Sequence, residues 1–346
     1  MIRLKKKSSD NFPYIIAEIS GNHNKSEMRS YKLIDEAKEV GVDAIKIQTF
    51  LPENITMDSK RKEFFINEKN SLWKGNYLYD LYKKSYPPKN LVKKIFNYAK
   101  KKNITCFSSV FDEDGLDFLE SLNNPIYKVA SFENNHFPLI NKIIDTNKPI
   151  IVSTGMLDKK GIFELVNIFK KRKYTNFALL KCTSSYPANP KNSNIITIPE
   201  MKKVFKCEVG LSDHTLGIGV ALGSIVLGSS IIEKHFTLTG DKVGIDKDFS
   251  LTKKDMKLLV DEGKRVYQSI GKVFFGISNE EKNSLKYKRS IYFKKSLKKN
   301  HVIKVEDIKI IRPSKGLHPR HLKKILNKKC KIDVKMGTPV SWNKII

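Results

Sequence analysis

The sequence predicts a closed (β/α)8 barrel over residues 1–270, followed by a small, mainly β domain over residues 286–346. Two observations lead to this fold. Short apolar runs alternate with helical patterns eight times along the chain, which is typical of a parallel sheet. Eight such units favour a closed barrel. The alternative is an open, doubly wound sheet, but no GxGxxG motif follows the first apolar run.

The first two strands are expected at residues 14–19 and 44–49, with an amphipathic helix over residues 26–40 between them. The pattern then breaks into a long polar insertion, residues 51–88, which becomes rich in aromatic residues toward its end. Insertions of this length inside a compact domain tend to be functional. We therefore expect residues 51–88 to form a lid or a wall of a pocket.

Regular alternation of strands and helices resumes after the insertion. Further strands are predicted at residues 104–108, 126–130, 149–153, 177–182, 209–211 and 231–234. Helices are predicted at residues 91–102, 112–122, 139–145, 159–171, 198–205 and 252–270, with a small-residue helix between the last two strands. Residues 271–285 form a plausible linker to the second domain, in which short β-like pieces surround one expected helix, residues 318–326.

Length, hydrophobic content and cysteine spacing indicate which class of protein this chain belongs to. The chain has 346 residues, 40% of them hydrophobic, which is enough for one large domain and a small one. No apolar run approaches the roughly 18 residues of a membrane span, and the basic N-terminal stretch leads into no apolar signal region. Four cysteines lie in no CxxC pair. We expect a cytoplasmic protein with reduced thiols and no membrane contact.

The formal net charge of +29 raises the question of a nucleic-acid partner. The lysines are scattered along the helices, however, and their densest cluster, residues 294–304, has no strong aromatic interleaving. The charge is therefore interpreted as a solvated surface that attracts anionic substrates. No nucleic acid is expected as a partner.

Two histidines suggest a metal site. His214 and His235 each follow directly on a short apolar run. If both runs are parallel strands, both imidazoles emerge at the same edge of the sheet, where they can hold one divalent metal and leave positions open for substrate. From spacing alone, two unrelated polar residues at strand ends remain the alternative.

Polar residues stand at the ends of all the predicted strands. A single serine at a strand end is usually a helix cap. Together, though, two lysines and at least four hydroxyl groups converge on one barrel mouth, as a phosphorylated or carboxylated ligand requires. The sequence therefore predicts an anion site there.

At these residues the chain resembles the sialic acid synthase family, whose members condense phosphoenolpyruvate with an N-acylated amino sugar to make a nonulosonic acid. The matching stretches follow in chain order: AEISGNHN (17–24), IKIQT (45–49), YKVASFE (127–133), STGM (153–156), LLKCTSSYP (179–187), GLSDHT (210–215) and EKHFTL (233–238). The stretch IRPSKGLHP, residues 311–319, is similar to the antifreeze-like (SAF) domain of these enzymes.

Within the family the likeness is greatest to pseudaminic acid synthases, through LYDLYKKSYPP, ASFENNHFPLI and LLKCTSSYPA. That branch implies 2,4-diacetamido-2,4,6-trideoxy-L-altrose as the sugar. Departures such as SSVFD at residues 108–112 and GID at residues 244–246 blur the sugar pocket. The alternative is therefore a neuraminate or legionaminate synthase, acting on N-acetylmannosamine or a diacetamido 6-deoxy-mannose.

The resemblance also implies a role for each site residue. The phosphoenolpyruvate ligands would be Lys46, Ser109, Lys128, Ser131, Ser153, Ser184 and Ser212. The sugar ligands would be Gln48, Glu133, Tyr186, Asp246 and Arg312. Glu18 is the candidate for acid–base work, with a structural carboxylate as its alternative. His214 and His235 would hold Mn²⁺ or Mg²⁺, of which two imidazoles suit Mn²⁺ better.

The family further implies a domain-swapped homodimer in which Arg312 of one subunit reaches the sugar bound by the other. A domain of about 60 residues is only marginally stable alone, so docking on a neighbour would help it. Two other classes of protein stay open. One is a barrel aldolase with Lys46 or Lys128 as its Schiff-base lysine, and the other is a non-enzymatic binding protein.

Overall fold

The computed structural model describes residues 4, 12–69 and 71–346. It divides the chain into two compact units, Met1–Gly271 and Lys272–Ile346. Within the described residues, no helix is both long and apolar enough to cross a membrane.

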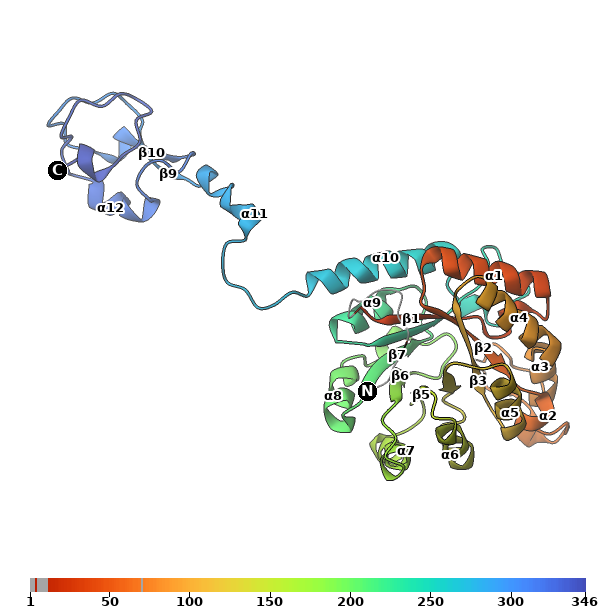
Figure 1. The fold of residues 1–346 in the computed structure, drawn as a ribbon. Coiled ribbons are helices and arrows are strands. Elements are labelled where there is room, and N and C mark those ends of the chain that lie inside the picture. Colours follow the sequence, from red (N-terminus) through yellow and green to blue (C-terminus); the bar gives the residue numbers. More distant parts are fainter. Residues whose placement is uncertain (1–3, 5–11, 70) are drawn as a thin grey trace. The chain divides into compact units, whose positions relative to one another are not determined.

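The first unit is a closed barrel of parallel strands in chain order, so the predicted fold is confirmed (Figure 1). Its strands are β1 (Tyr14–Glu18), β2 (Ala44–Thr49), β3 (Thr105–Val110), β4 (Tyr127–Val129), β5 (Ile150–Ser153), β6 (Phe177–Cys182), β7 (Glu208–Asp213) and β8 (Ile231–His235). The barrel closes because β1 pairs with both β2 and β8, which brings Glu18 level with Lys46 on one side and His235 on the other.

Helices surround the barrel (Figure 1). They are α1 (Glu27–Val40), α4 (Lys89–Lys101), α5 (Glu113–Ser121), α6 (Phe137–Asp145), α7 (Lys159–Lys171), α8 (Thr197–Phe205), α9 (Gly219–Val226) and α10 (Lys253–Ser269). Their ends follow capping chemistry. In α1, the Ser26 side chain accepts the Arg29 amide, and Gly41 ends the helix at φ +90°, a conformation that glycine adopts at little cost.

The insertion between β2 and α4 is partly helical, which the sequence analysis did not predict. It contains α2 (Pro52–Ile55), a 3₁₀ turn (Lys62–Phe64) and α3 (Leu78–Ser85). Leu81 is the buried residue of α3.

Side chains inside the barrel form an apolar layer with a polar layer above it. The apolar layer includes Ile16, Ala44, Phe107, Ile126, Ile151, Leu180 and Ile231. Because side chains of a strand alternate between its two faces, the residue two positions further along each strand points the same way. Those residues are polar, so the C-terminal end of the barrel interior is lined by charged, hydroxyl and thiol groups.

The second unit contains a small antiparallel sheet of β9 (Ser290–Phe293) and β10 (Ile308–Ile311). The other expected β pieces form only isolated bridges, such as Cys330 with Ile345. The helix expected at residues 318–326 is a 3₁₀ turn (Pro319–His321) followed by α12 (Leu322–Ile325). A further helical turn, α11 (Asn279–Lys282), lies within the stretch read as a linker.

Candidate active site

Eight buried residues, one from each strand, form the polar layer. They are Glu18, Lys46, Ser109, Lys128, Ser153, Cys182, Ser212 and Glu233. Six of them belong to the predicted site, and the structure brings them together as expected. Cys182 and Glu233 were not predicted.

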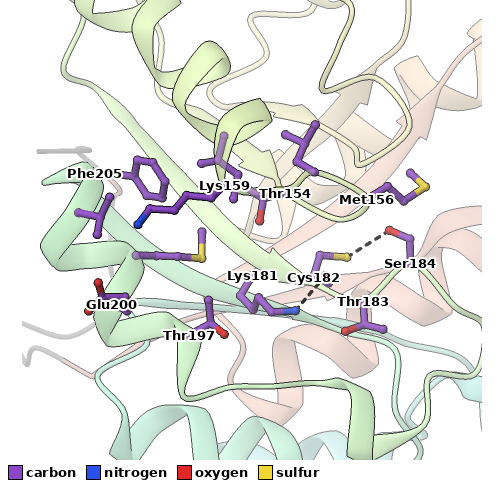
Figure 2. Close-up of a pocket in the computed structure, with 14 residues that line it drawn as sticks. Thr154, Met156, Lys159, Lys181, Cys182, Thr183, Ser184, Thr197, Glu200 and Phe205 are labelled. Carbon is purple, nitrogen blue, oxygen red and sulfur yellow. Dashed lines mark hydrogen bonds between the residues drawn. The ribbon is translucent and has the colours of Figure 1, made fainter.

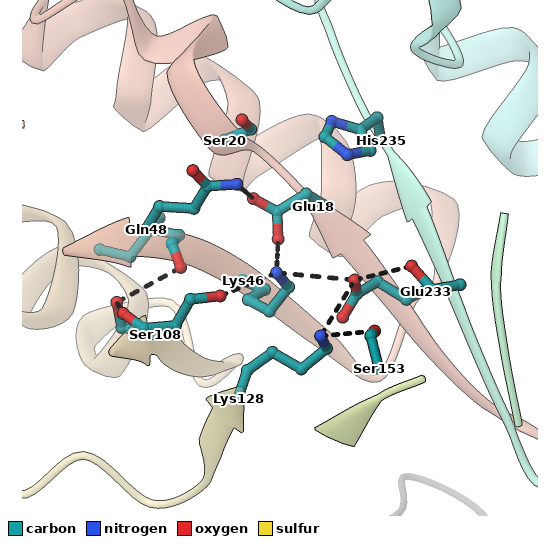
Figure 3. Close-up of polar contacts among 12 residues, drawn as sticks. Glu18, Ser20, Lys46, Gln48, Ser108, Lys128, Ser153, Glu233 and His235 are labelled. Atoms are coloured by element: carbon teal, nitrogen blue, oxygen red, sulfur yellow. Dashed lines mark hydrogen bonds and ion pairs between the residues drawn. The ribbon is translucent and has the colours of Figure 1, made fainter. Parts of the chain in front are cut away.

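Two lysines and two glutamates make up the charged part of this layer (Figure 3). Lys46 forms an ion pair with Glu18, and its Nζ lies 3.6 Å from Glu233 Oε1. Lys128 Nζ lies 3.9 Å from the same Glu233 oxygen. Burying charges is tolerated only when they are paired, and here each lysine has a carboxylate.

The two carboxyl groups titrate differently. Burial raises the pKa of Glu18 to about 7, although Lys46 opposes the shift. Burial acts on Glu233 in the same direction, but Lys128 and Lys46 outweigh it, and the pKa of Glu233 falls below its usual range. Glu18 can therefore exchange a proton near neutral pH, while Glu233 stays ionised.

Hydroxyl groups extend the two lysines into a cradle for an anion. Lys46 Nζ donates to Ser109 Oγ at 3.1 Å, and Lys128 Nζ donates to Ser153 Oγ at 2.7 Å. Two cations and several hydroxyl donors at one buried position suit a phosphate or a carboxylate. Ser212 differs from the other serines, because its hydroxyl donates to Glu233 at 3.2 Å.

The loops above β4, β5 and β6 bring two further predicted serines together. A methyl group on Gly155 would lie 2.2 Å from Ser184 Oγ and 2.6 Å from Ser131 Oγ. Only a residue without a side chain fits between the two hydroxyl groups. Gly155 of the STGM motif thus permits Ser131 and Ser184 to approach each other.

The two histidines lie side by side, with ring centroids 5.3 Å apart. His214 Nδ1 lies 3.0 Å from the carbonyl oxygen of Thr183, which fixes the proton on Nδ1 and leaves Nε2 as a ligand atom. His235 Nδ1 is buried without a hydrogen-bond partner and lies 3.7 Å from Asp246 Oδ2. Both rings fit a shared metal ion.

No group of three or more His, Cys, Asp and Glu side chains with the geometry of a metal site occurs in the described part of the chain. The protein would therefore supply two imidazoles. The other coordination positions would belong to substrate or water, as in catalytic rather than structural metal sites.

The predicted sugar ligands in the barrel unit surround this pair of histidines and the charged layer. The Tyr186 ring lies 4.4 Å from the His214 ring, centroid to centroid. Asp246 is held from two sides, because its carboxylate accepts from Ser20 Oγ and its amide donates to Asn22 Oδ1 at 3.0 Å. Gln48 Nε2 donates to Glu18 at 3.4 Å.

The insertion lies beside the candidate site. The Trp73 ring lies 5.5 Å from the Tyr186 ring, and Tyr82 packs edge-on against Phe50 at 5.9 Å. Burial raises the pKa of Tyr82, and the negative charge of the nearby Glu133 raises it further. Burial raises the pKa of Glu133 itself to about 7, and one of its carboxylate oxygens has no hydrogen-bond partner.

Arg312 belongs to the second unit. It lies on the exposed surface of the second unit, directly after β10. Its role toward the sugar therefore stays a prediction.

Glu233 was missed although the sequence held a signal for it. Ile231, Glu233 and His235 share one face of β8 because they are two residues apart. Since His235 was placed at the mouth, Glu233 must point into the barrel just below it. On β6, Cys182 lies two residues after the inward-facing Leu180, so its side chain also points into the barrel.

A barrel whose mouth carries two lysines, several hydroxyl groups and two buried imidazoles is typical of an enzyme that acts on anionic substrates. Comparison with known proteins narrows this class. The NeuB family matches residues 33–274, and the SAF domain matches residues 288–346. The chain belongs to the NeuB family.

Individual relatives extend over nearly the whole chain. The pseudaminic acid synthase of Campylobacter jejuni is 37% identical over 330 residues, covering 95% of this chain and 96% of that protein. The N,N'-diacetyllegionaminic acid synthase of the same organism is 33% identical, covering 91% and 94%. A crystal structure of the N-acetylneuraminic acid synthetase of Leptospira borgpetersenii, in complex with citrate, is 31% identical with a TM-score of 0.69, covering 80% and 92%.

Proposed function

We propose that this protein is a transferase that condenses phosphoenolpyruvate with an N-acylated amino sugar and water, giving a nonulosonic acid and phosphate. The observation that carries the proposal is the pair of buried lysines, Lys46 and Lys128, each next to a serine hydroxyl at the barrel mouth. This arrangement suits the phosphate and carboxylate groups of phosphoenolpyruvate.

In this proposal the polar layer binds and orients phosphoenolpyruvate. Its anionic groups lie on Lys46 and Lys128, with hydroxyl donors from Ser109, Ser131, Ser153, Ser184 and Ser212. The new bond joins C3 of phosphoenolpyruvate to the aldehyde carbon of the open-chain sugar, and phosphate leaves after water adds at C2. Fixing both reactants in one water-poor site removes much of the entropic barrier.

Glu18 is placed to move a proton in this reaction. It adjoins Lys46, accepts from Gln48, and has a pKa of about 7 because of its burial. A carboxyl group that titrates near the working pH can act as both acid and base. We assign to Glu18 the proton exchanged with the attacking water or the developing hydroxyl group.

A divalent metal, Mn²⁺ or Mg²⁺, would be held by His214 and His235. Bound there, it would polarise the aldehyde of the sugar. Asp246 Oδ2 lies 3.7 Å from His235 Nδ1, which is too far for a hydrogen bond but places a carboxylate beside the proposed metal-binding imidazole.

For the sugar, we propose 2,4-diacetamido-2,4,6-trideoxy-L-altrose, which makes the product pseudaminic acid. Support comes from the relatives of that name and from the aromatic side chains of the insertion. A 6-deoxy methyl group needs an apolar surface where a hydroxymethyl group would need polar partners. Gln48, Glu133, Tyr186 and Asp246 would contact the hydroxyl and N-acyl groups. Neuraminate or legionaminate synthesis is the alternative.

The test is phosphate release from phosphoenolpyruvate with a panel of sugars: the diacetamido-trideoxy-altrose, its 6-deoxy-mannose counterpart and N-acetylmannosamine. We expect the altrose to give the highest kcat/KM. Release with no sugar of the panel would contradict the proposal, and a higher kcat/KM with N-acetylmannosamine would reassign the product. Borohydride trapping separates a Schiff-base aldolase, since the proposed synthase forms no imine.

We further propose that the enzyme is a cytoplasmic homodimer. In it, the SAF domain of one subunit would complete the sugar site of the other by contributing Arg312. An always-charged, planar guanidinium suits the carbonyl of an N-acyl group.

A further inference from the structure

A cavity of about 450 Å³ lies between α7 and α8, on the outer side of β5 and β6 (Figure 2). Its walls are largely apolar, with Ile162 from α7 and Met201, Val204 and Phe205 from α8. The volume is typical of a site for a small organic ligand, and such sites combine apolar walls with a few polar groups.

Lys181 supplies the half-buried charge of this cavity, whose lining also includes the exposed Lys159 and Glu200. It lies on β6 between Leu180 and Cys182, which face the barrel interior, so its own side chain points outward between the two helices. Elsewhere on this face β6 carries apolar residues such as Leu179, which belongs to the core between barrel and helices. A lysine at such a position is an exception that packing alone does not explain.

The charge of Lys181 is not compensated within the described chain. Its Nζ donates to the carbonyl oxygen of Cys182 at 3.3 Å, and no carboxylate there forms an ion pair with it. By contrast Lys202, on the neighbouring part of α8, is paired with Glu208 at 3.5 Å. Partial burial lowers the pKa of Lys181, as expected for a cation that lacks a counter-ion.

This cavity adjoins the polar layer of the barrel at the end of β6, where Cys182 and Ser184 contribute to its lining. Lys46, Lys128, His214 and His235 take no part in that lining, so the charged residues of the candidate active site lie outside the cavity.

We propose that the cavity between α7 and α8 binds a small amphipathic anion, whose apolar body fills the space between the helices and whose anionic head pairs with Lys181. The hydroxyl groups of Thr183 and Thr197 also line the cavity; Thr183 Oγ1 donates to the Asn192 carbonyl oxygen at 3.2 Å, so Thr197 is the hydroxyl that offers a further donor for the head group. A purely apolar ligand is not the preferred occupant, because such a ligand would leave the Lys181 charge unpaired.

The probe for this site is 8-anilinonaphthalene-1-sulfonate, and its matched control is N-phenyl-1-naphthylamine, which has the same rings without the sulfonate. Fluorescence titration of the full-length wild type should show saturable sulfonate binding. Lys181→Met keeps the apolar stem but removes the charge. It should weaken sulfonate binding about tenfold, a typical loss for one charge-assisted hydrogen bond, and leave the neutral probe unaffected.

Two more variants complete the design. Val204→Trp fills the cavity and should weaken binding of both probes, with its fold checked by circular dichroism. Lys203→Met removes an exposed lysine from α8 and should bind both probes as the wild type does. Unchanged sulfonate binding in Lys181→Met would overturn the proposal. The proposal would also be overturned if neither probe bound to the wild type and Val204→Trp changed the sedimentation coefficient. That result would indicate that a second copy of the chain fills the cavity.

Discussion

Glu233 Oε1 lies 3.6 Å from Lys46 Nζ and 3.9 Å from Lys128 Nζ, so one carboxylate oxygen serves both cations of the candidate site. Under the proposed function, phosphoenolpyruvate would compete with Glu233 for these lysines. Removing the carboxylate and removing a lysine should therefore have opposite effects on anion affinity.

We predict that Lys128→Met weakens binding of phosphoenolpyruvate by about 10²-fold, while Glu233→Gln tightens it, even if both variants turn over slowly. Isothermal titration of each variant with phosphoenolpyruvate gives the affinities. Lys160→Met is the control, because the Lys160 side chain is 85% exposed and its loss removes a solvated charge without disturbing a buried ion pair. Weaker binding in Glu233→Gln would contradict the inferred competition.

Substituting either histidine should abolish turnover. His214→Ala or His235→Ala removes one of the two proposed protein ligands, so bound metal should be lost together with phosphate release, while circular dichroism stays unchanged. Metal content after gel filtration and activity in metal-limited buffer are the measurements. Near wild-type activity of either variant under those conditions would exclude the metal site.

The proposed swapped dimer predicts complementation between two inactive variants. Glu18→Ala and Arg312→Ala are each expected to be inactive. If Arg312 acts in trans, a mixed dimer has one intact site, and refolding both variants together should restore roughly a quarter of the activity, by random pairing of subunits. Lack of recovery, once co-assembly is confirmed by differently tagged chains, would show that Arg312 does not act across subunits.

Glu133 should make the protein less stable as the pH rises. Its pKa is about 7 in the folded state and 4.5 for an unperturbed side chain, so the folded protein holds the proton longer than the unfolded chain. Stability is then lost progressively between pH 4.5 and 7. Urea unfolding across this range should show a steeper decrease in stability for the wild type than for Glu133→Gln, in which residue 133 stays neutral and Glu18, with its own pKa of about 7, still titrates. If the free energy of unfolding fell equally with pH in the wild type and in Glu133→Gln, the pKa of Glu133 would not be raised in the folded protein.

Much of the barrel could be predicted from sequence because each strand is a short apolar run followed by a polar residue. The eight strands are recovered, with β4 shortened to Tyr127–Val129. The helix α3 was missed because Leu81 is its one buried residue, and a single buried apolar residue gives no helical periodicity. The β pieces of the second unit were overestimated because isolated bridges resemble strands in local sequence.

The sequence predicted which residues belong to the site, but not which of them form ion pairs and hydrogen bonds with one another. The polar residues at strand ends identified Lys46, Lys128 and the serines, but they could neither pair Lys46 with Glu18 nor place Glu233 between the lysines. Those contacts depend on the register of β1 against β2 and β8, which only the closed barrel sets. Lys181 was also missed, because the cavity that it lines depends on how α7 and α8 pack against the outer face of β6.

The two lysines and two glutamates of the polar layer sum to zero charge when all four are ionised. A multiply charged anion that enters this layer adds negative charge beside Glu18, whose pKa is already about 7. The same Coulombic effect that favours protonation of a carboxylate near another anion then raises that pKa further. Substrate binding near neutral pH should therefore draw a proton from solution into the barrel, and apparent affinity should fall as the medium becomes more alkaline.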